Sequence, residues 1–153
     1  MNIIAAIVII FSVVFDQLTK LWAADVLKSG SSIKIIGSFL RFTYAENKGA
    51  AFSILQNQRT FFLIMTIVML IFLGYIYFKT KNISNLSKLS IAMISGGAIG
   101  NFIDRLRLGY VIDFIDVRFG SIYNFPVFNI ADSFVVCGTL LMVILIIFNK
   151  FEA

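Results

Sequence analysis

Histidine is absent from this chain of 153 residues. Its absence excludes the Ser-His-Asp triad, the Cys-His pair and every zinc site that uses histidine. The single cysteine, Cys137, lies in an apolar run and has no partner for an internal disulfide, so we interpret it as a small apolar residue. The chemistry that remains is carboxylate chemistry, Ser/Lys chemistry or none.

Charge is also scarce, because 14% of the residues are charged and 59% are hydrophobic, and the mean hydropathy is +0.95. In a soluble domain about a quarter of the residues are charged. The sequence therefore predicts one domain over residues 1–153, surrounded mostly by lipid. The net charge is +5, but the basic residues flank apolar runs, which favours contact with anionic membrane lipid and no binding of nucleic acid.

Four segments approach the roughly 20 apolar residues that a membrane helix needs. They run from about 3 to 24, 60 to 78, 86 to 103 and 131 to 148. The first segment lacks the basic start and the cleavage site of a signal peptide, so we interpret it as a retained helix.

The connection between the second and third segments, residues 79–88, contains three lysines and no acid, which places it in the cytoplasm. With four spans, both termini then lie in the cytoplasm. This topology brings seven of the eight acidic residues to the outer face, and only Glu152 stays on the other side. Solvated charges scattered at random would not sort so completely.

The segments on the outer side alternate in polarity, as strands do. Residues 40–44 and 110–119 show this pattern, and residues 47–49 are typical of a turn. We expect a small sheet on the outer membrane surface. Residues 120–127 are interpreted as a loop or short helix that covers a site, with Pro126, the only proline, setting the loop before the last span. The predicted fold is an all-α membrane protein of four transmembrane helices with a small β-sheet.

Two aspartates, Asp113 and Asp132, lie at the edges of hydrophobic segments. A carboxylate beside hydrocarbon is costly and marks a candidate functional site. Two such groups about 3 Å apart cannot both ionise, so one takes a proton from water while the other donates to a carbonyl oxygen, as in aspartic proteases. The alternatives are a solvated strand residue for Asp113 and, for Asp132, a carboxylate that interacts with a helix dipole.

Other polar residues have a structural and a functional interpretation. Asn101 and Arg105 share one helical face and either brace the aspartates or a lipid headgroup, or belong to a packing face that is rich in glycine. Asp16 and Lys20 are four residues apart and are expected to pair with each other. Asn129 either orients a carboxylate or caps the last helix.

Together these pieces resemble bacterial lipoprotein signal peptidase (signal peptidase II). The resemblance covers nearly the whole chain and rests on five segments in family order: 15–20 (FDQLTK), 47–52 (NKGAAF), 96–105 (GGAIGNFIDR), 111–114 (VIDF) and 128–132 (FNIAD).

The resemblance implies an endopeptidase of the bacterial cytoplasmic membrane, with its active site at the outer face. It would remove the signal peptide from prolipoproteins, before a cysteine that already carries diacylglycerol. The family uses no metal or cofactor, has a small β-cradle and a mobile loop, here within about 116–128, and is expected to act as a monomer. Asp113 and Asp132 match its catalytic residues. Residues that match site-bracing or substrate-contacting positions are Asp16, Lys20, Asn47, Gly49, Asn101, Asp104, Arg105 and Asn129.

The sequence is less consistent with three other functions. A small transporter or channel would use acids as an ion path, but a path needs acids at several depths. A scaffold without catalysis would not need so many polar groups at the ends of its spans. A Ser/Lys protease would use Ser133 or Ser95 with Lys20, but no serine has a partner at a recognisable spacing.

Overall fold

The computed structural model describes residues 3–30, 32–49, 55–120 and 122–152. Residues 50–52 of the NKGAAF segment and residue 121 of the predicted covering loop therefore lie outside the described residues. Within these ranges the chain forms four helices and a four-stranded sheet. The helices are α1 (Ile3–Leu27), α2 (Arg59–Lys79), α3 (Asn85–Arg107) and α4 (Ile130–Ile147), and the strands are β1 (Ile33–Ile36), β2 (Leu40–Asn47), β3 (Val111–Phe119) and β4 (Tyr123–Asn124).

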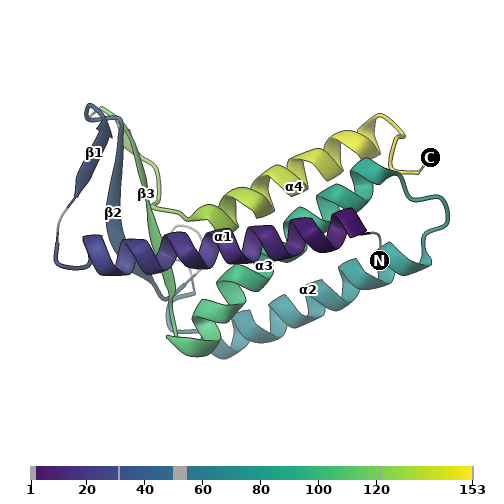
Figure 1. Cartoon of the computed structure of the whole chain (residues 1–153), viewed down its shortest axis with the longest axis horizontal. Coiled ribbons are helices and arrows are strands. Elements are labelled where there is room, and N and C mark those ends of the chain that lie inside the picture. The colour runs from purple at the N-terminus through teal and green to yellow at the C-terminus, as the bar shows by residue number, and fades with distance from the viewer. Residues whose placement is uncertain (1–2, 31, 50–54, 121, 153) are drawn as a thin grey trace.

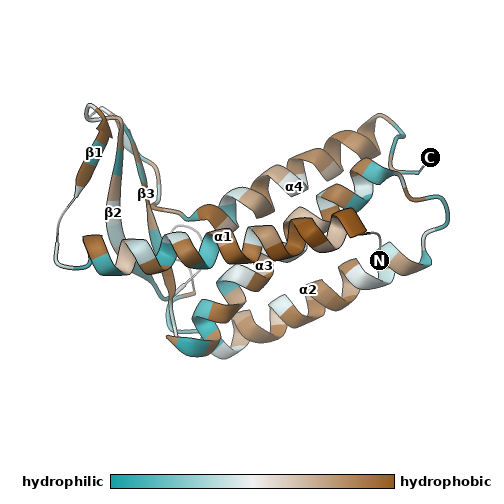
Figure 2. Cartoon of the chain, viewed as in Figure 1, coloured by the Kyte–Doolittle hydropathy of each residue, from teal (hydrophilic) through white to brown (hydrophobic). Residues whose placement is uncertain are grey.

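All four helices are long and apolar enough to cross a membrane. Figure 2 shows their hydrophobic surfaces running along the bundle, with hydrophilic residues concentrated toward its two ends. Large apolar side chains point outward from the helices, among them Ile7, Phe11, Ile64 and Ile144. An outward-facing apolar belt is stable in hydrocarbon and not in water. The prediction of a four-helix membrane protein with a small sheet is confirmed.

Two helices extend past their predicted ends. α1 continues through Asp16 to Leu27, and α3 continues through Asp104 to Arg107. The first helix was predicted to end at about 24, with Asp16 inside it, and the third at about 103, just before Asp104. Both acids pair with the buried ammonium of Lys20, which offsets their charge within the helices. Asp16 and Asp104 therefore project from within helices and not from helix ends.

α3 lies in the middle of the bundle and packs on the other three helices. Its glycines permit this close packing. A Cβ atom on Gly97 would overlap the carbonyl oxygen of Ala131 in α4, and one on Gly100 would come within 2.6 Å of the Asp16 carboxyl in α1. α1 and α4 consequently approach α3 at the depth where the polar residues lie.

The sheet stands across one end of the bundle, and both chain termini lie at the other end (Figure 1). All its strand pairs are antiparallel, in the order β1-β2-β3-β4. β2 is longer than predicted and includes Asn47, which pairs with Val111 of β3. Residues 120–127, expected as a loop or short helix, contribute β4, and their described part is not helical.

The C-terminal tail is fixed to the start of α3 at the end opposite the sheet. The Phe151 carbonyl accepts hydrogen bonds from the Ser84 amide at 3.0 Å and from the Ser87 hydroxyl at 2.7 Å. The Phe151 side chain packs against a buried cluster that includes Leu73 and Ile94. The tail therefore closes the bundle at this end.

Candidate active site

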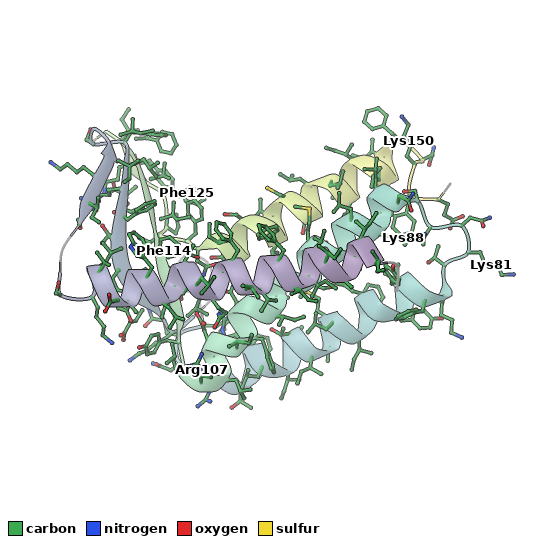
Figure 3. All side chains as sticks on the ribbon, viewed as in Figure 1. Lys81, Lys88, Arg107, Phe114, Phe125 and Lys150 are labelled. Atoms are coloured by element: carbon green, nitrogen blue, oxygen red, sulfur yellow. The ribbon has the colours of Figure 1, made fainter. Side chains whose placement is uncertain are left out.

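A cavity of about 670 Å³ opens where the sheet meets α3 and α4. Asp113 and Asp132 both line it, one from β3 and one from the first turn of α4. Much of the remaining wall is apolar, contributed by residues such as Phe125 and Val135. In Figure 3, Phe125 and Phe114 lie at the sheet end of the molecule, where this cavity is found. The cavity therefore combines two carboxyl groups with a surface suited to apolar ligands.

Asp113 is held by two amide side chains. The Asn129 Nδ2 group donates to its Oδ1 at 2.6 Å, and the Asn47 Nδ2 group donates to its Oδ2 at 2.9 Å. Its side chain is buried, with the residue 2% exposed. Asn47 is itself oriented, because its Oδ1 accepts from the Gly49 amide at 2.9 Å. The position of the Asp113 carboxyl is therefore set from β2 and from the start of α4.

Asp132 belongs to the N-terminal cap of α4. The Asn129 side chain accepts from the Asp132 amide at 2.9 Å, and the Asp132 carboxyl accepts from the Asn129 amide at 3.1 Å. This reciprocal pair is a capping box, which satisfies two helix-end donors at once. The two interpretations of Asn129, cap and carboxylate partner, are both correct, and its contacts join Asp132 to Asp113.

Asn101 links the second aspartate to a buried cluster of charges. Its Nδ2 group donates to Asp132 at 2.7 Å, and its Oδ1 accepts from Lys20 Nζ at 2.8 Å. Since an ammonium only donates, this contact fixes which way the Asn101 amide faces. Lys20 also pairs with Asp16 at 2.9 Å and with Asp104 at 3.0 Å. The expected Asp16–Lys20 pair is thus part of a larger network.

Arg105 lines the same cavity but contacts neither aspartate directly through a hydrogen bond in the described residues. Its guanidinium donates to the Gly49 carbonyl at 3.0 Å and lies over the Phe62 ring, 4.8 Å from the centroid. It therefore holds the segment after β2 and places a positive charge near both carboxylates. This matches a bracing role more closely than a role as partner of one aspartate.

The environment of Asp113 changes its ionisation. Burial, and next the negative charge of Asp132, raise the pKa of Asp113 to about 7, while the hydrogen bonds from Asn47 and Asn129 act in the opposite direction. Near neutral pH this carboxyl therefore retains a proton for much of the time. A carboxyl that holds a proton near neutral pH and shares a cavity with a second carboxyl is suited to acid/base catalysis on an amide.

Sequence reasoning missed two features of this end of the molecule. The Gln17 side chain donates to Asp104 at 2.9 Å and completes the buried network; its place on the helical face of Lys20, three residues away, was the available signal. Asp116 is buried and paired with Arg41 at 2.6 Å. That ion pair joins β2 and β3, strands whose pairing could not be read from spacing.

The fold matches that of solved bacterial membrane enzymes. One of them, determined by the in meso method at 2.3 Å resolution, superposes with a TM-score of 0.89 at 40% identity, covering 95% of this chain and 88% of that chain. Together with the polar cavity inside an apolar bundle, this likeness defines the class: a multi-span membrane enzyme.

The comparisons with protein sequences define the family. A family model described as signal peptidase (SPase) II matches residues 8–148. The lipoprotein signal peptidase of Caldanaerobacter subterraneus subsp. tengcongensis is 47% identical over 146 residues, which are 95% of this chain and 97% of that protein. That of Clostridium tetani is 41% identical over 141 residues, 92% of this chain and 90% of that protein. The chain belongs to the signal peptidase II family and is a peptidase.

Proposed function

We propose that this peptidase removes the signal peptide from prolipoproteins, cleaving before a cysteine that carries diacylglycerol, and that Asp113 and Asp132 activate the attacking water. The observation that carries the proposal is the joint placement of these two carboxyl groups in one cavity, with Asn129 hydrogen-bonded to both. Family membership and the relatives' shared name, lipoprotein signal peptidase, support the choice of substrate.

In the proposed reaction the ionised carboxyl takes a proton from water, and the water oxygen bonds to the carbonyl carbon of the scissile amide. The protonated carboxyl donates its proton to the carbonyl oxygen. When the C–N bond breaks, the carboxyl that took a proton from water passes it to the leaving amine of the cysteine. The intermediate returns the other proton to the second aspartate as the carbonyl re-forms within the new carboxyl group. The four oxygens of the pair already accept amide hydrogen bonds, from Asn47, Asn129 and Asn101, so both groups are held in place before substrate arrives.

The apolar part of the cavity is proposed to bind the lipid end of the substrate. Val135 and Val136 line it from α4, a helix that is apolar enough to face hydrocarbon. Acyl chains can therefore stay in lipid while the neighbouring peptide bond reaches the aspartates. In this arrangement the diacylglyceryl group supplies binding energy that a bare peptide lacks.

The membrane position follows from charge. The lysine-bearing connection after α2 lies at the same end as both termini (Figure 1), and short basic connections stay in the cytoplasm. We place the cavity at the outer face of the bacterial cytoplasmic membrane. An ion path is not favoured, because seven of the eight acids lie in the half of the molecule that carries the sheet.

The test uses purified enzyme and a synthetic prolipoprotein peptide with a diacylglyceryl cysteine, with products followed by mass spectrometry. Asp113→Asn and Asp132→Asn should each reduce cleavage by at least roughly 10²–10⁴-fold, since each removes one acid/base group. Asp25→Asn is the matched control, because Asp25 is an exposed aspartate near the end of α1 that lies beside the sheet. Substantial cleavage by Asp113→Asn or Asp132→Asn, in a variant that elutes from size-exclusion chromatography like the wild-type protein, would rule out the proposed pair.

A second experiment tests whether the enzyme requires a lipidated substrate. The same peptide without the diacylglyceryl group should be cleaved with a much lower kcat/KM, because the apolar wall of the cavity then has nothing to bind. Equal cleavage of both peptides would keep the catalytic pair and reject the proposed lipid recognition.

A further inference from the structure

A second concavity lies at the end of the bundle opposite the sheet. It is a groove of about 600 Å³ between α2 and α4, with Ile94 of α3 at its base. Leu73 and Ile76 line it from α2, and Met142 and Val143 line it from α4. The groove shares no lining residue with the cavity that holds the aspartates. It is therefore a separate site, on a surface that faces lipid.

The groove has the length of an acyl chain in one leaflet. It extends from Thr139 in α4 to Asn149 in the tail. Over its helical part, Thr139 to Ile147, a rise of about 1.5 Å per residue gives about 12 Å, close to half of the roughly 30 Å hydrocarbon thickness of a bilayer. Its deep end lies near the middle of the membrane and its mouth lies at the surface. A single lipid tail can therefore occupy it from the mouth inward.

The mouth of the groove carries an excess of positive charge. Lys79 follows the lining residue Ile76 by three positions and so lies on the same side of α2. Lys150 lies between the lining residues Asn149 and Phe151. Figure 3 shows Lys81, Lys88 and Lys150 at this same end. Within the described part of the chain, none of these lysines takes part in an ion pair, and Glu152 is the acid beside them.

We propose that this groove is a binding site for an anionic phospholipid, with one acyl chain between α2 and α4 and the phosphate headgroup at Lys79 and Lys150. Four lysines against one carboxylate favour an anionic headgroup over a zwitterionic one. The tail supports the site directly, because Phe151 and Glu152 line the groove and are fixed to the start of α3. The proposal does not depend on the catalytic pair.

The experiment compares lipid retention by the full-length protein in detergent, measured by native mass spectrometry. The probes are phosphatidylglycerol and phosphatidylcholine with identical acyl chains, offered at equal concentration. The wild-type protein should retain phosphatidylglycerol over phosphatidylcholine by about tenfold or more, since two lysines near the surface favour the anion. Inorganic phosphate at the same concentration should not displace the lipid, because it cannot fill the groove.

Two variants, each with a control, distinguish the contribution of the lysine charges to lipid binding from that of the apolar groove. Lys79→Gln/Lys150→Gln should reduce the preference to nearly equal retention, whereas Lys28→Gln/Lys34→Gln, which removes two exposed charges at the sheet end, should retain it. Val143→Trp should fill the groove and abolish retention of both lipids. Ile144→Trp is its control, because Ile144 is exposed on the same helix but does not line the groove.

Three results would overturn the proposal. They are equal retention of the two lipids by the wild-type protein, a preference that survives loss of Lys79 and Lys150, and displacement of the lipid by inorganic phosphate. Because the lysine variants change exposed residues, they test the site even where Val143→Trp fails to fold.

Discussion

At the scale of single residues, Asn129 joins local structure to the site. One side chain begins α4, accepts from Asp132 and donates to Asp113. Serine could also cap the helix, but a hydroxyl donates a single hydrogen bond, whereas Asn129 Nδ2 donates to both Asp113 and Asn101. The choice of asparagine at this position is therefore explained by the site and not by the helix. The same holds for Asn101, whose two ends contact Lys20 and Asp132.

The pH dependence of cleavage tests the shared proton. Activity should fall by about tenfold per pH unit above the alkaline pKa of the pair, because ionising both groups removes the acid. With the pKa of Asp113 raised to about 7, this decline should begin near neutral pH. The measurement is kcat/KM against pH from 5 to 9. A profile that stays level up to pH 9 would contradict the assignment.

Removing Asn47 should shift the alkaline limb of the pH profile, the decline in kcat/KM at high pH, in a defined direction. The hydrogen bond from Asn47 stabilises the ionised form and lowers the pKa of Asp113. Asn47→Ala should therefore raise this pKa and shift the alkaline limb to higher pH, with a reduced maximal rate. A shift to lower pH, or a lower rate with an unchanged limb, would show that the bond does not act on the titration.

The buried ammonium of Lys20 should matter for stability. Lys20→Met leaves Asp16 and Asp104 without their cation, which costs about 3–5 kcal/mol for a buried pair. The expected result is a clear drop in the thermal unfolding midpoint. Lys28→Met is the control, because its ion pair with Glu46 is exposed and contributes about 1 kcal/mol or less. Equal midpoints for the two variants would refute the stabilising role of the network.

At the scale of elements, the close contact between α3 and α4 depends on a missing side chain. Gly97→Ala should destabilise the protein by about 1–3 kcal/mol, because the new Cβ would overlap Ala131 and Val135. Gly74→Ala in α2 has open space around its Cβ and should leave the protein equally or more stable. Thermal unfolding in detergent measures both. A Gly97→Ala variant as stable as the wild-type protein would refute the packing role of Gly97, because helix propensity alone favours alanine.

Among the helices and strands, some were predictable from the sequence and others were not. The four helices follow from apolar length and their positions were predicted within a few residues, and the alternation of 40–44 and 110–119 predicted two of the strands. The end of α3 was placed too early, because Asp104 looks like an interruption until its pairing with Lys20 is seen. Strand β4 and the Asp116–Arg41 pair arise from contacts between distant segments, which no local pattern contains.

At the scale of the whole molecule, the two ends of the bundle differ in chemistry. The sheet end carries the buried acids and the other end carries free lysines and both termini. The proposed orientation can be checked with a membrane-impermeant maleimide in a Cys137→Ser background. Lys34→Cys in β1 should react in intact cells, and Lys81→Cys should react only after the membrane is opened. The reverse labelling pattern would invert the topology.

The contact between the Ala131 amide and Asp16 has a consequence for how the enzyme is made. Asp16 and Lys20 are synthesised early, whereas Asn129 and Asp132 arrive with the last helix. Protein chains leave the ribosome with the N-terminus first. Until translation is nearly complete, the nascent chain therefore contains Lys20 and Asp113 but lacks Asn129 and Asp132, which connect them in the folded protein. With Asp132 as one of the proposed catalytic pair, we expect proteolytic activity to begin only when the final span enters the bilayer.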